Sequence, residues 1–374
     1  MKRRGFVTVI LIVVVILLIG LIGLFGYAIY MQITGEGSLK INFDKESGIS
    51  IGGYDNPTID NEDVTTSSNM TLSGVNGDNT NTQNKINRNL YNQLSNTAKT
   101  IYSELYKNKE NLKTGTYKVE FGESFSSLLS KEGGEEELKR EYQSAIEALL
   151  YDNPEIFYLE VTNMYIKIEK ITRITGIKYN VYIDNSSNVS YLAEGFYSKQ
   201  SVDEADAKIE QAKNEILSLT TGKSDYEKIK IVHDYLIDNI DYDTTVLQSN
   251  IYNIYGALVS KKCVCEGYAK AFQYLMNELE IDNTIVIGTA TNSNNETENH
   301  AWNYVKLDGN WYAIDVTWDD PVIIGGGKLS DKSRYQYFLR GSSTFYQNHV
   351  ESNTFTEGGQ WFTYPTLSVN DYDA

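Results

Sequence analysis

The segment that decides the fold runs from His300 to Asp315 and reads His-Ala-Trp-Asn-Tyr-Val-Lys-Leu-Asp-Gly-Asn-Trp-Tyr-Ala-Ile-Asp. It contains two runs rich in apolar and aromatic residues, and Asp308 and Gly309 separate them. An Asp-Gly pair between two such runs is typical of a two-residue β-hairpin turn. The segment is therefore predicted to form an antiparallel hairpin.

The register of this hairpin brings a histidine and a carboxylate onto one face. With Asp308 and Gly309 as the turn, Trp302 pairs with Asp315, so His300 and Asp315 become diagonal neighbours. Diagonal positions are roughly 7–8 Å apart at the backbone, and long side chains can span that distance with a hydrogen bond. A four-residue loop keeps this arrangement, whereas a three-residue loop shifts the register by one and places the two side chains on opposite faces.

A cysteine stands at the start of a predicted helix upstream of the hairpin. One face of this helix carries the apolar side chains of Ala269, Phe272, Met276 and Leu279. At the helix start, the unpaired N–H groups and the positive dipole end favour the thiolate of Cys265, which is the nucleophilic form. The Cys265 N–H is one candidate oxyanion donor, and the sequence identifies no second donor. Gly267 allows backbone or substrate to approach closely.

The chain order Cys265, His300, Asp315 supplies a candidate nucleophile, a candidate base and an orienting carboxylate, the pattern of a thiol acyl-transfer site. The stretches Cys265-Glu-Gly-Tyr-Ala-Lys-Ala-Phe272, His300-Ala-Trp-Asn303 and Asp315-Val-Thr-Trp-Asp319 resemble the transglutaminase-like superfamily. The resemblance spans about Asp225 to His349. It implies a papain-like α+β fold, with the cysteine-bearing helix packed on an antiparallel sheet that carries the histidine and the aspartate in the roles named above.

Cys263 departs from the pattern of this family, because many relatives have glycine two residues before the nucleophile. It is predicted to be structural, and a resolving thiol for oxidised Cys265 is the alternative. A disulfide between these two cysteines would be strained, so no disulfide framework is expected. Metal binding by Cys-x-Cys with His233, His300 or His349 lacks a second cysteine pair or a His-x-x-x-His spacing. No metal and no cofactor are therefore predicted.

Other residues of the same segments are assigned supporting roles. Trp302 and Trp318 are expected to line the site or to pack beneath it. Asn303 and Asp319 are expected to support the strand ends through hydrogen bonds. Of the remaining histidines, His233 shares a helical face with Ile229 and Ile240, so it is predicted to lie at the boundary between core and surface with its hydrogen bonds satisfied. His349 has no partner evident in the sequence.

An apolar stretch close to the N-terminus predicts a single membrane anchor. Residues 5–35 contain no charged side chain, and residues 6–30 are long enough to cross a bilayer. A secretory signal peptide is the alternative, although its apolar region is typically about 7–15 residues and a small-residue cleavage site follows it. The basic residues Lys2, Arg3 and Arg4 predict a cytoplasmic N-terminus and an extracellular remainder.

Four segments are predicted along the chain: a cytoplasmic tip and anchor (1–35), a flexible linker rich in Asn, Thr, Ser and Gly (36–84), an N-terminal α+β region (85–200) and the catalytic domain (201–374). Helices are expected over 86–112, from Glu135 to Asp152, over 202–219 and over 225–240. A strand is expected over 177–183 and another over 285–290, followed by a polar loop over 291–299.

The net charge of −17 over 374 residues argues against nucleic acid as a partner. The sequence instead predicts a membrane-anchored, cell-surface cysteine enzyme that acts on amide or peptide bonds of proteins or cell-wall peptides, by hydrolysis or by acyl transfer to an amine. A catalytically silent adaptor module at the cell surface is the first alternative. A structural role, with the N-terminal α+β region docking a partner, is the second.

Overall fold

The computed structural model describes residues 41–44, 48–51, 89–173, 176–185, 189–246, 248–320, 331–355 and 359–373 of the chain. It separates into two compact units, Met1–Pro57 and Thr58–Ala374. In the first unit, strands β1 (Ile41–Asp44) and β2 (Gly48–Ile51) form an antiparallel hairpin within the segment predicted as a linker. The predicted membrane helix lies outside the described residues. Among the residues that are described, no helix has the length and apolar character needed to span a membrane.

The described part of the second unit begins with three helices where a single one was predicted over 86–112. The chain breaks after the first helix because Ser95 caps the second, its hydroxyl accepting a hydrogen bond of 3.1 Å from the Ala98 N–H. Asn108 is both the residue at which the second helix ends and the residue that precedes the third. The helices are α2 (Asn89–Gln93), α3 (Asn96–Lys107) and α4 (Lys109–Leu112).

A three-stranded antiparallel sheet follows, with its strands in the order β3-β5-β4. The long helix α6 lies between β3 and β4 in the sequence. The predicted strand over 177–183 is the centre of β5, and the predicted helix from Glu135 ends where expected, at Asp152. The partner strand β4 was not predicted. The elements are β3 (Val119–Gly122), α5 (Ser126–Leu129), α6 (Gly134–Asp152), η1 (Val161–Asn163), β4 (Met164–Arg173) and β5 (Gly176–Asn185).

Two capped helices lead to the cysteine. Helices α7 (Lys199–Ser218) and α8 (Asp225–Asn239) agree with the predicted ranges to within a few residues, and each begins with a capping box. A short parallel pair, β6 (Asp241–Tyr242) with β7 (Lys262–Cys263), then places the chain just before the cysteine. The π-helical turn η2 (Gly256–Ser260) lies between these two strands in the sequence.

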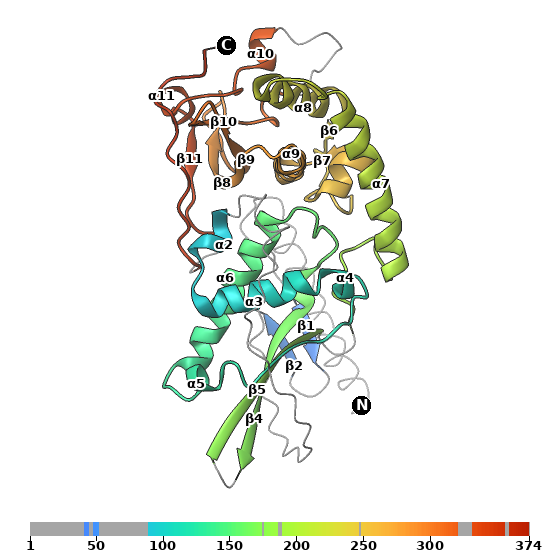
Figure 1. Ribbon diagram of the computed structural model, residues 1–374, viewed down its shortest axis with the longest axis vertical. Helices are drawn as coiled ribbons and strands as arrows, with labels where there is room; N and C mark the ends of the chain where they lie inside the picture. The colour runs from blue at the N-terminus through green and yellow to red at the C-terminus, as the bar shows by residue number, and fades with distance from the viewer. Residues whose placement is uncertain are drawn as a thin grey trace, which may run out of the picture. The chain divides into compact units, whose positions relative to one another are not determined.

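Helix α9 (Cys265–Glu278) packs against a four-stranded antiparallel sheet in the order β10-β9-β8-β11 (Figure 1). Ala269, Ile285 and Ala301 form a small buried cluster between this helix and the sheet. The Asn303 side-chain amide donates a hydrogen bond of 3.0 Å to the Ala269 carbonyl oxygen. The helix is thereby held against the strand that carries His300. Asn303 makes a hydrogen bond as expected, but it lies within β9 and supports the helix rather than a strand end.

The hairpin has the register that the Asp-Gly turn predicts. Asn310 pairs with Leu307, and the ladder continues to the pair Ile314–Asn303. Asp308 and Gly309 both have positive φ, at 49° and 83°, as a type I′ turn requires. The strands are β8 (Asn283–Thr291), β9 (Thr297–Leu307) and β10 (Asn310–Ile314), so the polar loop before β9 is shorter than predicted.

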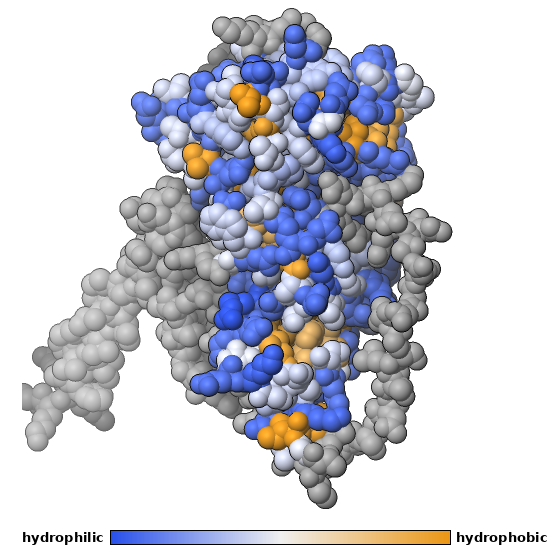
Figure 2. All heavy atoms as spheres, turned by 60° about the vertical axis from the view of Figure 1, so that its left-hand side comes forward, coloured by the Kyte–Doolittle hydropathy of each residue, from blue (hydrophilic) through white to orange (hydrophobic). Residues whose placement is uncertain are grey.

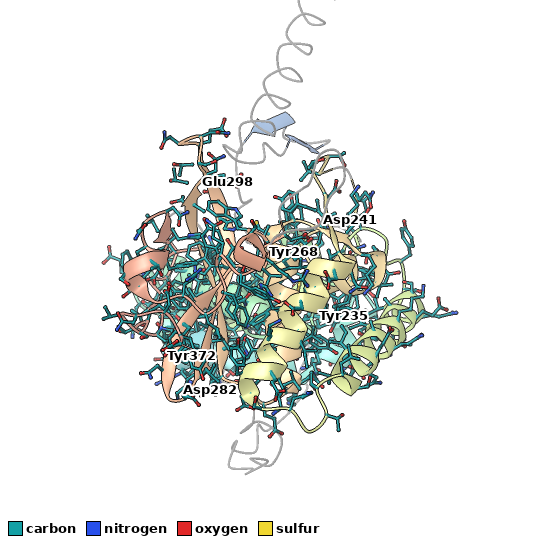
Figure 3. The ribbon with its side chains drawn as sticks, turned by 90° about the horizontal axis from the view of Figure 1, so that it is seen from above. Tyr235, Asp241, Tyr268, Asp282, Glu298 and Tyr372 are labelled. Carbon is teal, nitrogen blue, oxygen red and sulfur yellow. The ribbon has the colours of Figure 1, made fainter. Side chains whose placement is uncertain are left out.

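The C-terminal segments complete the sheet. Helices α10 (Asp331–Arg334) and α11 (Ser342–Phe345) precede β11 (His349–Glu351), which pairs with β8. Figure 3 shows Glu298 at one end of the sheet and Asp282 at the other, so the turn of the hairpin and the start of β9 lie at opposite ends. On the face drawn in Figure 2, hydrophobic residues lie in small groups between hydrophilic ones.

Substitution of Gly309 by alanine is expected to lower the free energy of unfolding by about 1–2 kcal/mol, because an L-residue is disfavoured at positive φ. Nothing lies within 4 Å of a Cβ built at Gly309, so backbone strain is the source of the loss. Urea unfolding measures the effect. Asn310→Ala at the next, exposed position is the control, and an equal loss in both variants would contradict the prediction.

Candidate functional site

The site begins at the first residue of α9. Val264 adopts extended backbone (φ −102°, ψ −177°), and its N–H donates to the Ile251 carbonyl oxygen at 3.1 Å, which fixes the entry into the helix. Cys265 is therefore the first helical residue, as predicted, and its side chain is partly exposed. The N–H groups of the first helical turn have no partner within the helix, and they lie at the same N-terminal end of α9 as the Cys265 side chain.

Gly267 is required by close packing beneath the first turn of α9. A Cβ at this position would lie 2.5 Å from Cys263 Cβ and 2.6 Å from the Ile251 carbonyl oxygen. The Cys263 side chain packs under the helix and is fully buried. Burial also raises the pKa of the Cys263 thiol. Cys263, which stands where many relatives have glycine, therefore packs under α9.

His300 and Asp315 are brought together as the hairpin register predicts. His300 Nε2 lies 2.8 Å from Asp315 Oδ2, and both residues are buried. Asp315 lies one residue beyond the end of β10, so its pairing with Trp302 is not part of the ladder, but its side chain still reaches across the hairpin. The Nε2 nitrogen is occupied by the carboxylate, which leaves Nδ1 as the ring nitrogen for the thiol.

The protonation of this pair follows from the competition between burial and charge. Burial alone would lower the pKa of His300, but the Asp315 carboxylate and the Cys265 side chain raise it to about 10. Burial would raise the pKa of Asp315, but His300 and then His349 hold it well below its ordinary value. A protonated imidazole beside an ionised carboxylate is therefore the favoured state of the pair.

Cys265 interacts with the His300 ring, since its side chain contributes to the raised pKa of that histidine through hydrogen bonding and charge. Two tyrosines also lie within electrostatic reach of Cys265. Burial, followed by the Cys265 side chain, raises the pKa of Tyr242. Tyr252 is half exposed and interacts with Cys265 and Glu266. Sequence reasoning missed both tyrosines, because their proximity depends on non-local contacts: the β6–β7 pairing for Tyr242, and the hydrogen bond between Val264 and Ile251 for Tyr252.

His349 also contacts Asp315, and the sequence offered no signal for it. Its Nε2 lies 3.1 Å from Asp315 Oδ2, the same oxygen that faces His300. The remaining oxygen, Oδ1, accepts a hydrogen bond of 3.1 Å from the Trp318 N–H. Strand β11 carries His349 to this position by pairing with β8, so the contact arises only in the folded sheet.

Aromatic rings surround the His300–Asp315 pair. Trp302 is buried and its ring centroid lies 6.1 Å from that of His300, so it packs beneath the site. The half-buried Trp318 lies 5.3 Å from the same ring. These positions agree with the two roles predicted for the tryptophans, and the rings exclude water from the pair.

His233 belongs to a second histidine–carboxylate pair. Its Nε2 lies 3.1 Å from Asp319 Oδ2, and its Nδ1 lies 3.1 Å from Asp234 Oδ1. His233 is fully buried rather than at a boundary, and its hydrogen bonds are satisfied as predicted. Asp319 also accepts a hydrogen bond of 2.8 Å from the Tyr337 N–H, which confirms its supporting role.

Among the described residues, His300, Asp315 and His349 are close enough to be considered as metal ligands, with one ligand atom each and all of these within 4.8 Å of one another. Both histidine Nε2 atoms lie at hydrogen-bonding distance from one carboxylate oxygen, so N–H donors account for the arrangement. A metal ion would require both nitrogens to lose their protons. The geometry therefore favours a hydrogen-bonded cluster.

Comparison with known proteins follows this geometry. Residues 213–316 match the family model described as the transglutaminase-like superfamily. The mouse (Mus musculus) Kyphoscoliosis peptidase is 26% identical over 153 residues, which cover 37% of this chain and 23% of that protein. The human (Homo sapiens) Kyphoscoliosis peptidase is 24% identical over 149 residues, covering 36% and 22%. The chain thus spans less than a quarter of the length of these curated relatives.

Among solved structures, a protein described as a TGase is 17% identical, with 48% of this chain and 50% of that chain covered and a TM-score of 0.28.

Alkylation by iodoacetate is expected to modify Cys265 and to spare Cys263, which is buried. The rate is expected to fall as the pH rises through about 10, because His300 then loses the proton whose charge attracts the reagent anion. Mass mapping and rate measurements between pH 6 and about 11 test both points. Neutral iodoacetamide is the control. A fall of the same size with this reagent, or labelling of Cys263, would contradict the prediction.

Proposed function

Because residues 213–316 form a domain of the transglutaminase-like superfamily, we propose that the chain is a cysteine enzyme acting on amide or peptide bonds. The observation that carries the proposal is the buried hydrogen bond of 2.8 Å between His300 and Asp315, with the His300 ring interacting with Cys265. A base that is steadied by a carboxylate and faces a thiol is the arrangement that activates a nucleophile.

In the proposed reaction, His300 holds the proton of Cys265 and the thiolate attacks the carbonyl carbon of the substrate amide. The C–N bond breaks as imidazolium transfers its proton to the leaving amine, and a thioester remains on Cys265. Water or a second amine then attacks the thioester, and His300 accepts a proton from that attacking group. The C–S bond breaks, which releases the acyl product and returns Cys265 to the thiolate beside the His300 imidazolium. Asp315 stays ionised throughout and stabilises the imidazolium.

The developing oxyanion requires hydrogen-bond donors near Cys265. The backbone N–H of Cys265 at the start of α9 is the proposed first donor, because the first-turn N–H groups of a helix have no partner within the helix. The positive end of the helix dipole adds to this stabilisation. Both effects act on the carbonyl oxygen as it becomes negatively charged.

Hydrolysis and acyl transfer share the thioester and differ only in the acceptor. The two curated relatives are named as peptidases, which supports hydrolysis as one arm of the proposal. Protein or cell-wall peptides are the proposed substrates, because the predicted anchor and linker would place the domain outside the membrane.

Replacing Cys265 by alanine is expected to reduce turnover by about 10³-fold or more, because the nucleophile is lost. The purified protein is incubated with glutamine-containing peptides and a labelled amine. Amine incorporation indicates acyl transfer, ammonia or peptide release without incorporation indicates hydrolysis, and silence favours the adaptor alternative. Cys263→Ala is the matched control, since this thiol is buried under α9. Equal turnover by Cys265→Ala and the parent protein would refute the mechanism.

We also propose that the N-terminal apolar stretch anchors the protein in a membrane with the catalytic domain outside. Removal of residues 1–35 is expected to shift the protein from the membrane fraction to the soluble fraction, because the hydrophobic segment is lost. Removal of residues 36–84 is the control, and that variant is expected to stay with the membrane. Detergent-independent solubility of the intact protein would contradict the proposal.

A further inference from the structure

His349 is a buried histidine that the proposed reaction does not use. It is 1% exposed, and its ring stacks on Phe345 with centroids 4.0 Å apart and an interplanar angle of 22°. The rings of Trp302, Trp318 and Tyr337 lie between 4.8 and 5.3 Å from it. The aromatic packing holds the plane of the ring, and the hydrogen-bond partners at its two nitrogens set the orientation in which Nε2 faces Asp315.

The hydrogen-bond partners of His349 show which nitrogen carries a proton. Nδ1 lies 2.9 Å from Asn348 Oδ1, and the Asn348 amide nitrogen donates to the Tyr337 hydroxyl at 2.9 Å. With this amide orientation, both ring nitrogens donate and His349 is positively charged. With the amide turned over, Nδ1 accepts and the ring is neutral. In both cases Nε2 carries a proton, because the lone pair of an unprotonated nitrogen would be repelled by the negatively charged Asp315 oxygen.

We propose that His349 is a positioning residue: its Nε2–H shares the Asp315 carboxylate with His300 and limits how strongly that carboxylate holds the His300 proton. Two donors meet at a single oxygen, at 2.8 Å from His300 and 3.1 Å from His349. An oxygen that accepts two such bonds has less negative charge available for each. The role rests on the proposed function, because it concerns the base of that site.

The benefit of sharing lies in the second half of the proton transfer. His300 must accept a proton from the thiol and later return it to the leaving amine, so an imidazolium that is too stable is a poor general acid. The titratable groups around the His300–Asp315 pair are Cys265, His349, Tyr337 and Asp319. Of these, only His349 supplies Asp315 with a second imidazole donor, and the Trp318 N–H keeps the carboxylate aimed when that donor is removed.

The test uses His349→Phe, which keeps a ring on Phe345 but removes the donor. Loss of this hydrogen bond is expected to raise the pKa of His300 by about one unit, whether His349 is neutral or charged. The chain has three histidines, so NMR of protein labelled with ¹³C-histidine follows each ring separately. This readout needs no substrate and would not move if His349 only filled space.

His349→Gln is the conservative variant, since its side-chain N–H can donate to Asp315 and is expected to keep the His300 titration near that of the parent protein. His233→Gln is the matched control, because His233 is also buried and also lies 3.1 Å from an aspartate. If the phenylalanine is not accommodated, His349→Met removes the same donor with a flexible side chain.

An unchanged or lowered pKa of His300 in His349→Phe, or an equal shift in His233→Gln, would overturn the role of His349. Failure of the proposed function gives a different result. In that case iodoacetate does not label Cys265 preferentially in the parent protein, whatever residue occupies position 349.

Discussion

The site depends on one buried charge, the carboxylate of Asp315. An isolated carboxylate that is removed from water loses several kcal/mol of solvation free energy, and such a group takes up a proton unless donors surround it. Donors come from three elements of the fold: His300 in β9, His349 in β11 and the Trp318 N–H in the turn after β10. The carboxylate can therefore be both buried and ionised only because the sheet and the turn together supply these donors, which couples the chemistry to the fold.

Sequence reasoning predicted those parts of the site that short-range rules determine. The Asp-Gly turn specifies the hairpin register, and the register places His300 beside Asp315. The apolar stripe after Cys265 specifies a helix that begins at the cysteine. The side-chain interaction between Cys265 and His300 is not local, since it requires α9 to pack on the sheet, and here the resemblance to a known family supplied what periodicity could not.

Other parts of the fold and of the site were not predicted, for different reasons. His349 reaches Asp315 because β11 pairs with β8, and a three-residue strand has too little periodicity to be recognised. Strand β4 alternates apolar and charged residues, as in Ile166, Lys167 and Ile168, and this alternation is itself typical of a half-buried strand. The predicted helix over 86–112 is split because the side-chain cap at Ser95 outweighs the helical preference of the residues around it.

The turn after β10 carries two carboxylates that face different histidines, and their environments diverge. Burial raises the pKa of Asp319 to about 6, although His233 and the Tyr337 N–H oppose this effect. Asp315 is at least as deeply buried, yet its pKa is held low. The difference between the two pKa shifts follows from how the histidines are shared. His233 divides its two nitrogens between Asp319 and Asp234. Asp315 instead receives donors from two histidines, His300 and His349. Two aspartates four residues apart thus serve different purposes: one fastens α8 to the turn, and the other keeps a charge beside the base.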